Sequence, residues 1–101
     1  MFENGELTRL LEAVSDPVRR QIVFLLKHRA PLNVGEIAGQ FRISRPAISH
    51  HLKVLKDAKI VQSEKRGQEV YYRLDIERMV VALRTLADRL EQFASDEPPS
   101  L

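Results

Sequence analysis

SRPAISHHLKVLK, residues 44–56, has the pattern of a short helix whose two faces differ in chemistry. Ile48, Leu52 and Leu55 follow the i, i+4, i+7 spacing of a buried stripe, and His51 lies beside them. The opposite side carries hydroxyl, imidazole and cationic groups without a carboxylate, from Arg45, Ser49, Lys53 and Lys56 with Pro46 and His50 beside them. Such a face suits an acceptor-rich polyanion, and double-stranded DNA is the obvious candidate.

Positive charge is concentrated around this stretch. The chain has a net charge of +2, but residues 42–73 hold eight lysines and arginines against three carboxylates, a net +5. Concentrated positive charge is typical of a nucleic-acid-binding surface. On charge alone, a basic surface that only meets solvent is an equally good interpretation.

Length and composition limit the classes of protein that fit. A chain of 101 residues with 44% hydrophobic content is expected to form one domain with a small core. The absence of cysteine excludes disulfides, thiolate metal ligands and thiol redox sensing. No signal peptide is visible, and no apolar segment approaches the roughly 20 residues of a membrane helix. We therefore expect a cytoplasmic protein without membrane contact.

Two helices are expected before residue 30. Residues 6–14 place four apolar side chains on one stripe, Leu7, Leu10, Leu11 and Val14. Asp16 can cap a second helix that ends near His28. Its inward residues are Val18, Ile22, Leu25 and Leu26, and its outward residues are Arg19 and Arg20.

The two helices of a helix-turn-helix follow. Asn33 and Glu36 have the spacing of a capping box, so a short helix is expected to start there and to end between Gly39 and Phe41. Ser44 can cap the next helix, although its hydroxyl is also a candidate for DNA contact. Two short helices joined by a tight turn, the second basic, form a helix-turn-helix pattern.

A change of period after residue 58 predicts a β-hairpin. Residues 60–65 and 69–74 are the expected strands, whereas residues 30–32 are expected only as an extended connection. The turn is basic, and Gly67 suits its positive φ. Its candidates for DNA contact are Lys65, Arg66, Gly67 and Gln68, with Arg73 in support. The alternative is an ordinary hairpin with a solvated tip.

The last helix is expected to start after Asp75 and to span about 19 residues. Its apolar stripe, Ile76, Val80, Leu83, Ala87, Leu90 and Phe93, is widened by Met79 and Leu86. Because this stripe exceeds what one small domain covers, a dimer interface with the first helix is expected. The candidates for that interface are Leu7, Leu10, Leu11, Val80, Leu83, Leu86, Ala87, Leu90 and Phe93.

The expected architecture is therefore mainly α with a small β-hairpin. It is a winged helix-turn-helix over residues 1–94 that dimerises through its first and last helices, followed by a disordered tail at 95–101.

Three blocks of sequence, at residues 15–26, 44–58 and 66–74, resemble the ArsR-type (arsenic-repressor-like) winged-helix transcriptional regulators. The blocks occur in the right order and spacing, and the resemblance covers residues 6–93. It implies a homodimer, usually a repressor that leaves its operator when an effector binds.

The same resemblance defines departures. Asn33-Val34-Gly35 stands where the metal-sensing members carry Cys-Val-Cys, so that metal site cannot form. Other members bind metal between paired last helices with Asp and His, but the last helix here offers only carboxylates, Asp75, Glu77, Asp88 and Glu91. We therefore expect no metal and no cofactor. Arg45 replaces a common glutamine, and Lys59 replaces a common glycine, at a cost of about 1 kcal/mol if its φ is positive.

These residues fit the possible functions unequally. A dimeric repressor on a palindromic operator fits best, with Arg45 reading guanine or clamping a phosphate, and Lys53 and Lys56 serving the DNA backbone. The alternative is a ligand- or metal-responsive sensor with an unidentified small-molecule effector between the first and last helices of the dimer. An enzyme is not expected, because the chain has no nucleophile elbow, zinc-protease motif or phosphate loop. A protein-binding module would need an apolar recognition face, and this face is basic.

Overall fold

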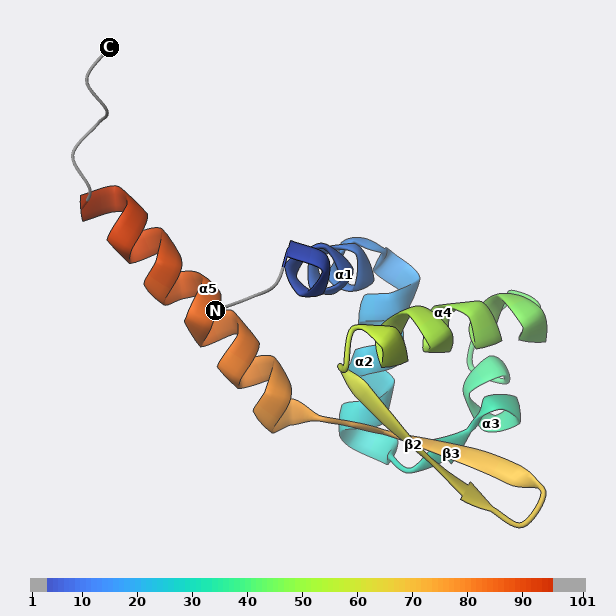
Figure 1. Ribbon diagram of the computed structural model, residues 1–101. Helices are drawn as coiled ribbons and strands as arrows, with labels where there is room; N and C mark the ends of the chain where they lie inside the picture. Colours follow the sequence, from blue (N-terminus) through green and yellow to red (C-terminus); the bar gives the residue numbers. More distant parts are fainter. Residues whose placement is uncertain (1–3, 96–101) are drawn as a thin grey trace.

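The computed structural model describes residues 4–95, with only the backbone for Asn4 and Leu7. Along the chain the elements are α1 (Asn4–Ser15), α2 (Pro17–Arg29), β1 (Leu32–Asn33), α3 (Val34–Ala38), α4 (Arg45–Asp57), β2 (Val61–Arg66), β3 (Glu69–Leu74) and α5 (Ile76–Ser95). Helices α1 to α4 and the sheet gather into one body, and α5 extends away from it (Figure 1). The mainly helical, winged helix-turn-helix architecture is confirmed.

Capping side chains fix the starts of the helices, as predicted. The Asp16 carboxylate accepts from the Arg19 backbone N–H at 3.0 Å, and the Ser44 hydroxyl accepts from the Ala47 N–H at 3.2 Å. Asn33 and Glu36 form both bonds of the capping box, at 2.8 and 3.0 Å. Each cap satisfies backbone donors that the first turn of a helix leaves free.

The core lies between α1, α2, α3, α4 and the start of β2. The apolar stripe predicted for α4 is fully buried, because Ile48, Leu52 and Leu55 are each 0% exposed. Burying a side chain of this size contributes about 1.5–3 kcal/mol, so this stripe fixes which face of α4 points outward. The remaining core residues are Leu10, Ala13, Ile22, Leu26, Ile37, Ile60 and Val61.

The sheet has three strands where only a hairpin was expected. Strands β2 and β3 pair in antiparallel register from Val61↔Leu74 to Arg66↔Glu69, and Gly67 in the turn has φ 63°. Strand β1 adds to the other edge of β3, in the order β1-β3-β2. Leu32 therefore belongs to a strand and not to a plain connection. A two-residue strand carries no periodicity, so its pairing partner alone reveals it.

Lys59, at the end of α4, has a φ of 63°. This is the left-handed conformation considered above for a lysine at a position where glycine is common. The Lys59 N–H donates to the Lys56 carbonyl at 2.9 Å, and the Ile60 N–H donates to the Leu55 carbonyl at 3.0 Å. These two bonds form a Schellman motif, and Ile60 and Leu55 are both buried beside it. The motif ends α4 and directs the chain into the wing.

Asp75 caps the start of α5, because its carboxylate accepts from the Arg78 N–H at 3.1 Å. Only its inner edge, including Met79 and Ala82, packs against the core, and none of its residues is buried. The helix runs through Ser95, so residues 96–101 of the expected disordered tail lie outside the described residues. No helix within residues 4–95 has the length and apolar character needed to cross a membrane.

Candidate nucleic-acid interface

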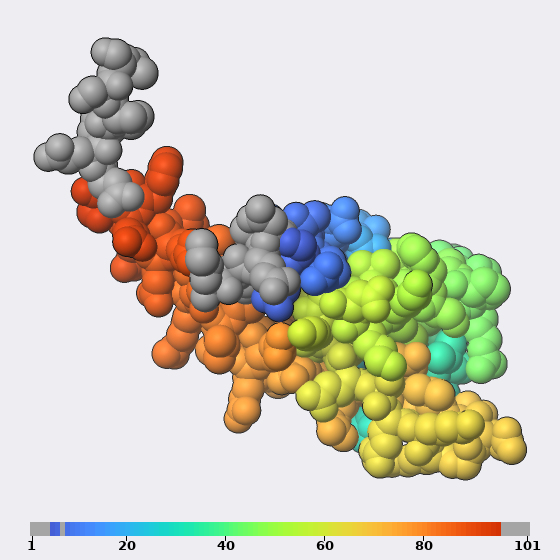
Figure 2. All heavy atoms as spheres, viewed as in Figure 1, coloured from blue at the N-terminus to red at the C-terminus, as the bar shows by residue number. Residues whose placement is uncertain are grey.

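The outward face of α4 is open along its length. The candidates on it are all exposed, namely Ser44, Arg45, Pro46, Ser49, His50, Lys53 and Lys56. Figure 2 shows α4 and the wing on one side of the molecule, with α5 projecting from the opposite end. The fold thus brings together the two cationic segments that the sequence singled out, and it buries none of their candidate residues.

The two neighbouring histidines of α4 have different surroundings. His50 is exposed, whereas the His51 side chain is 17% exposed, as expected for a histidine beside the core stripe. Their rings are 6.0 Å apart between centroids. Among the residues that the structure describes, no group of three or more histidine, aspartate or glutamate side chains is placed to hold a metal ion.

Arg19 corrects one expectation. It is not directed outward like the exposed Arg20 but is half-buried, and it donates to the Ala13 and Glu12 carbonyls at 3.0 and 2.7 Å. Its third contact is with Nδ1 of His51, at 3.1 Å. The last carbonyls of a helix lack backbone partners within it. The Arg19 guanidinium donates to the Ala13 carbonyl and shares the Glu12 carbonyl with the Ser15 hydroxyl, which lies 2.8 Å from it.

Asp16 completes this junction. The pKa of its carboxyl is lowered, mainly because the Arg19 backbone N–H donates to it, with further help from the positive charge of the Arg19 guanidinium. Partial burial acts in the opposite direction and raises the pKa. The carboxylate is therefore held in the ionised form that caps α2.

Arg45 begins α4 beside the start of α3. Its Nη1 lies 3.7 Å from the position that a Cβ on Gly35 would occupy. An alanine at position 35 would therefore place its Cβ in ordinary van der Waals contact with the Arg45 guanidinium. Sequence reasoning did not connect these two residues, because they come from different helices.

The wing carries a carboxylate among its cations. Lys65, Arg66, Gly67 and Gln68 are exposed, as a DNA-contacting turn requires. Arg66 lies over the Tyr71 ring, 5.2 Å from its centroid, and its Nη2 is 3.3 Å from Oε2 of Glu64. Arg73 lies 3.8 Å from the same oxygen. Glu64 is one of the three carboxylates counted in residues 42–73, but the sequence did not predict its contacts with Arg66 and Arg73, although residues 64 and 66 fall on one face of a strand.

The candidate dimer face is open in part. Exposed members are Leu11 (49%), Val80 (42%), Leu83 (53%), Leu90 (60%) and Phe93 (78%), together with Ala87. Leu86 is half-buried, and the Leu7 side chain lies outside the described part of the chain. Leu10, which its spacing assigns to the open face, is only 6% exposed and packs in its own core, so it is corrected to a core residue.

An open groove lies where the alternative function would place an effector. It has a volume of about 480 Å³ and runs between the start of α1 and the first half of α5. Its lining residues are Glu6, Asp75, Glu77, Arg78, Val81, Ala82 and Thr85. The lining mixes charged and apolar groups without selecting one class of ligand.

Comparison with known proteins gives consistent matches. Residues 16–63 match the model of the arsR family of bacterial regulatory proteins. The transcriptional repressor SdpR of Bacillus subtilis is 44% identical over 69 residues, which is 68% of this chain and 76% of that protein. The HTH-type transcriptional regulator Rv2034 of Mycobacterium tuberculosis is 47% identical over 81 residues, 80% of this chain and 74% of that protein. These relatives are named as regulators and not as enzymes.

Solved structures agree in fold. An ArsR-like transcriptional regulator from Rhodococcus sp. RHA1 has a TM-score of 0.78 and 30% identity, covering 89% of this chain and 82% of that chain. The homodimeric winged helix-turn-helix DNA-binding domain Mb0332 of Mycobacterium bovis has a TM-score of 0.67 and 24% identity. It covers 93% of this chain and 89% of that chain.

Proposed function

This chain belongs to the ArsR family of bacterial regulatory proteins, and on that basis we propose that it represses transcription as a homodimer bound to a palindromic operator. The observation that carries the proposal is the outward face of α4. Over residues 44–56 that face is exposed and cationic without a carboxylate, and the exposed Asp57 follows only at the end of the helix. The buried stripe beneath the face fixes its direction. A helix with this surface fits the major groove of B-DNA.

Within that proposal the candidate residues have separate roles. Arg45, at the start of α4, reads a guanine through O6 and N7, the commonest specific contact. Lys53 and Lys56 contact phosphates and supply affinity that does not depend on sequence. Ser44, Pro46, Ser49 and His50 complete the contact face of α4. Lys65, Arg66, Gly67 and Gln68 bring the wing to the adjacent minor groove or its phosphates.

The second copy joins through α5 and α1. The apolar stripe on α5 leaves four large side chains of the candidate interface exposed, together with Leu11 of α1, and apolar surface of this extent favours contact with another copy. Val81 is also 63% exposed but lies about 180° around the helix from Leu90, outside that stripe. The Mb0332 domain, which shares this fold, is a homodimer. A two-fold axis between two copies would set the two α4 helices into successive major grooves, about 34 Å apart.

The 101 residues contain no cysteine, so the proposal includes no thiolate metal site and no cysteine pair on this chain. It does not extend to the signal that would release the protein from DNA.

Selection of bound duplexes from random DNA tests the proposal. We expect enrichment of an inverted repeat whose half-sites are centred about one helical turn, 10–10.5 base pairs, apart. Affinity should fall steeply with salt, because binding releases counterions from phosphates. Arg45→Glu should abolish enrichment, whereas Arg89→Glu, with the same change of charge on α5, should not. A selected pool that competes no better than random DNA at moderate salt would contradict the proposal.

A further inference from the structure

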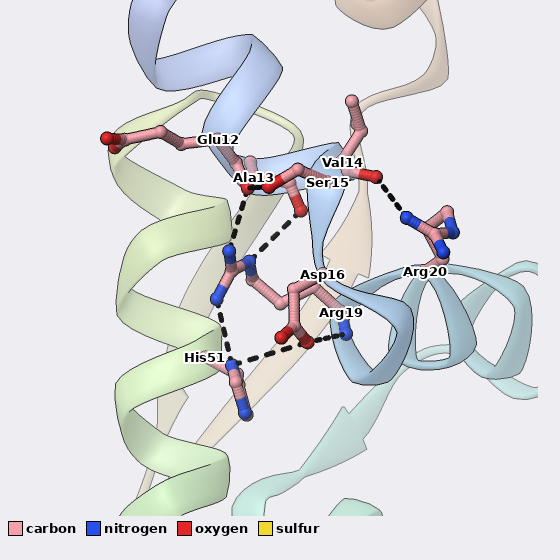
Figure 3. A network of polar contacts seen from close by, with 8 residues as sticks. All are labelled: Glu12, Ala13, Val14, Ser15, Asp16, Arg19, Arg20 and His51. Atoms are coloured by element: carbon pink, nitrogen blue, oxygen red, sulfur yellow. Dashed lines mark hydrogen bonds and ion pairs between the residues drawn. The ribbon is translucent and has the colours of Figure 1, made fainter.

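Arg19 joins three parts of the fold at the junction between α1 and α2 (Figure 3). Its Nε and Nη2 donate to the last-turn carbonyls of α1, at Ala13 and Glu12. Its Nη1 lies 3.1 Å from Nδ1 of His51, near the middle of α4. A single half-buried side chain therefore connects the candidate dimer helix to the candidate recognition helix.

The chemistry of this contact defines the tautomer of His51. A guanidinium only donates hydrogen bonds, so Nδ1 of His51 accepts and the ring proton of the neutral imidazole lies on Nε2. Oδ2 of Asp16 is 4.0 Å from the same nitrogen, beyond hydrogen-bond distance. The link from Arg19 to α4 is thus a directed bond to one atom and not a general attraction between charges.

A directed bond at His51 limits the rotation of α4 about its axis. Adjacent helical residues point about 100° apart, so a fixed His51 also sets the directions of Ser49 and His50 on the outward face. The buried apolar stripe sets which side of α4 faces the core, through contacts that act on the whole face and not on one atom. Arg19 adds the directional restraint and anchors it to the end of α1.

Arg20 provides an internal comparison. Its Nη1 donates to the Val14 carbonyl at 2.7 Å, so it also closes the last turn of α1. It is exposed and extends away from α4 (Figure 3). The neighbouring arginines therefore share one role, at the end of α1, and differ in the contact with His51.

We propose that Arg19 is a positioning residue that transmits the orientation of α1 to α4 through His51 and so sets the half-site spacing that the dimer accepts. This inference rests on the proposed function, because spacing has meaning only for a dimer on a two-part operator. Arg19→Lys keeps the charge but removes the planar fork that reaches three acceptors at once.

The DNA test compares Arg19→Lys with Arg20→Lys on the selected operator and on versions with a single base pair added or removed between the half-sites. Wild type and Arg20→Lys should discriminate against the altered spacings. In Arg19→Lys, the ratio of the affinity for the selected spacing to the affinity for an altered spacing should fall about five- to tenfold. The affinity for random DNA and the dimer dissociation constant should stay within about twofold of the wild-type values. Equal discrimination by the two lysine variants would overturn the proposal.

A second measurement does not need DNA. Imidazole ¹⁵N shifts of His51 at neutral pH should report the Nε2–H tautomer in wild type and in Arg20→Lys, and a mixture of tautomers in Arg19→Lys. An unchanged tautomer in Arg19→Lys would overturn the coupling. If wild type selects no operator, the proposed function fails while this spectrum still decides whether Arg19 holds His51.

Variants of His51 keep the test independent of any folding defect in Arg19→Lys. His51→Asn places an amide oxygen near the position of Nδ1 and should retain spacing discrimination, whereas His51→Leu should lose it. A double-mutant cycle between Arg19→Lys and His51→Leu should show that the two effects do not add. Additive effects would mean that the residues act separately, contrary to the proposal.

Discussion

At the scale of the residue, Arg45 and Lys53 share the exposed face of α4 but should affect DNA binding differently. Arg45→Ala should cost about 1–3 kcal/mol at one base position of the operator, because it removes a contact to a base edge. Lys53→Ala should weaken all sequences alike and reduce the salt dependence by about one phosphate contact. Competition binding with every single-base variant of the operator measures both effects. A uniform loss in Arg45→Ala would instead assign Arg45 to a phosphate.

Lys59 stores backbone strain at the end of α4, because its φ of 63° is unfavourable for a residue with a Cβ. Lys59→Gly should raise the free energy of unfolding by up to about 1 kcal/mol. Lys56→Gly, the same substitution inside α4, should lower it by about 1 kcal/mol. Urea titration of both variants gives the comparison. Destabilisation by Lys59→Gly would show that the Lys59 side chain has a stabilising role that outweighs the strain.

Contacts between residues close in sequence could be predicted, whereas contacts between residues far apart in sequence could not. The caps at Asp16, Asn33 and Ser44 each act within three residues, so a short sequence window contains donor and acceptor together. Arg19 contacts His51, 32 positions away, and no local pattern indicates that pairing. Arg19 was predicted to point outward because of its position in the helical period. That period gives the direction of the Cα–Cβ bond, but not where the end of a long side chain lies.

At the scale of the element, predictability depended on how strongly each segment is patterned. The amphipathic α4 and the alternating wing strands were placed correctly, because burial on one side imposes a period. Strand β1 has two residues, and its backbone bonds arise only when it meets Tyr71 and Tyr72 of β3. Tertiary contact, and not local preference, creates such an element.

The wing contains a carboxylate that should limit its affinity for DNA. Glu64 lies within 4 Å of both Arg66 and Arg73, so it competes with phosphate for their guanidinium groups. Exposed ion pairs are worth at most about 1 kcal/mol, so Glu64→Gln should raise DNA affinity about two- to fivefold. Titration of operator and random duplexes by fluorescence anisotropy measures this change.

Glu69→Gln separates this competition from the general effect of charge. Glu69 is exposed on the same hairpin, and its substitution removes the same charge. Although it is opposite Arg66 in the strand register, the two arginines form their ion pairs with Glu64 and not with Glu69. Its effect should be smaller than that of Glu64→Gln if the arginine contacts matter. Equal increases would mean that only the net charge of the wing affects affinity.

In the whole molecule, the other elements of a single chain cover only part of the apolar surface of α5. Figure 1 shows α5 extending beyond the body formed by the other elements, and its apolar stripe reaches Phe93, which is 78% exposed. The sequence indicated this excess of apolar surface, because the stripe continues beyond what one small core can cover. It could not indicate the angle at which a second copy crosses, which depends on the packing of both surfaces.

Leu90→Glu tests the dimer through this stripe. A symmetric interface contains every residue twice, so one substitution places two carboxylates in the apolar contact. Burying an unpaired carboxylate costs several kcal/mol, and the dimer dissociation constant should rise by about 100-fold or more. Gln92→Glu introduces the same charge two residues away, about 200° around the helix, and should leave the dimer intact.

Sedimentation equilibrium and operator binding should change together in these variants. A Leu90→Glu monomer should still bind random duplexes through its own α4 and wing, because phosphate contacts do not need the partner. Its affinity for the two-part operator should fall towards that level, because the second half-site no longer benefits from a linked copy. If Leu90→Glu sediments as a monomer yet binds the intact operator like wild type, a chain acting alone would be the functional unit. The two-fold arrangement of α4 helices would then be wrong.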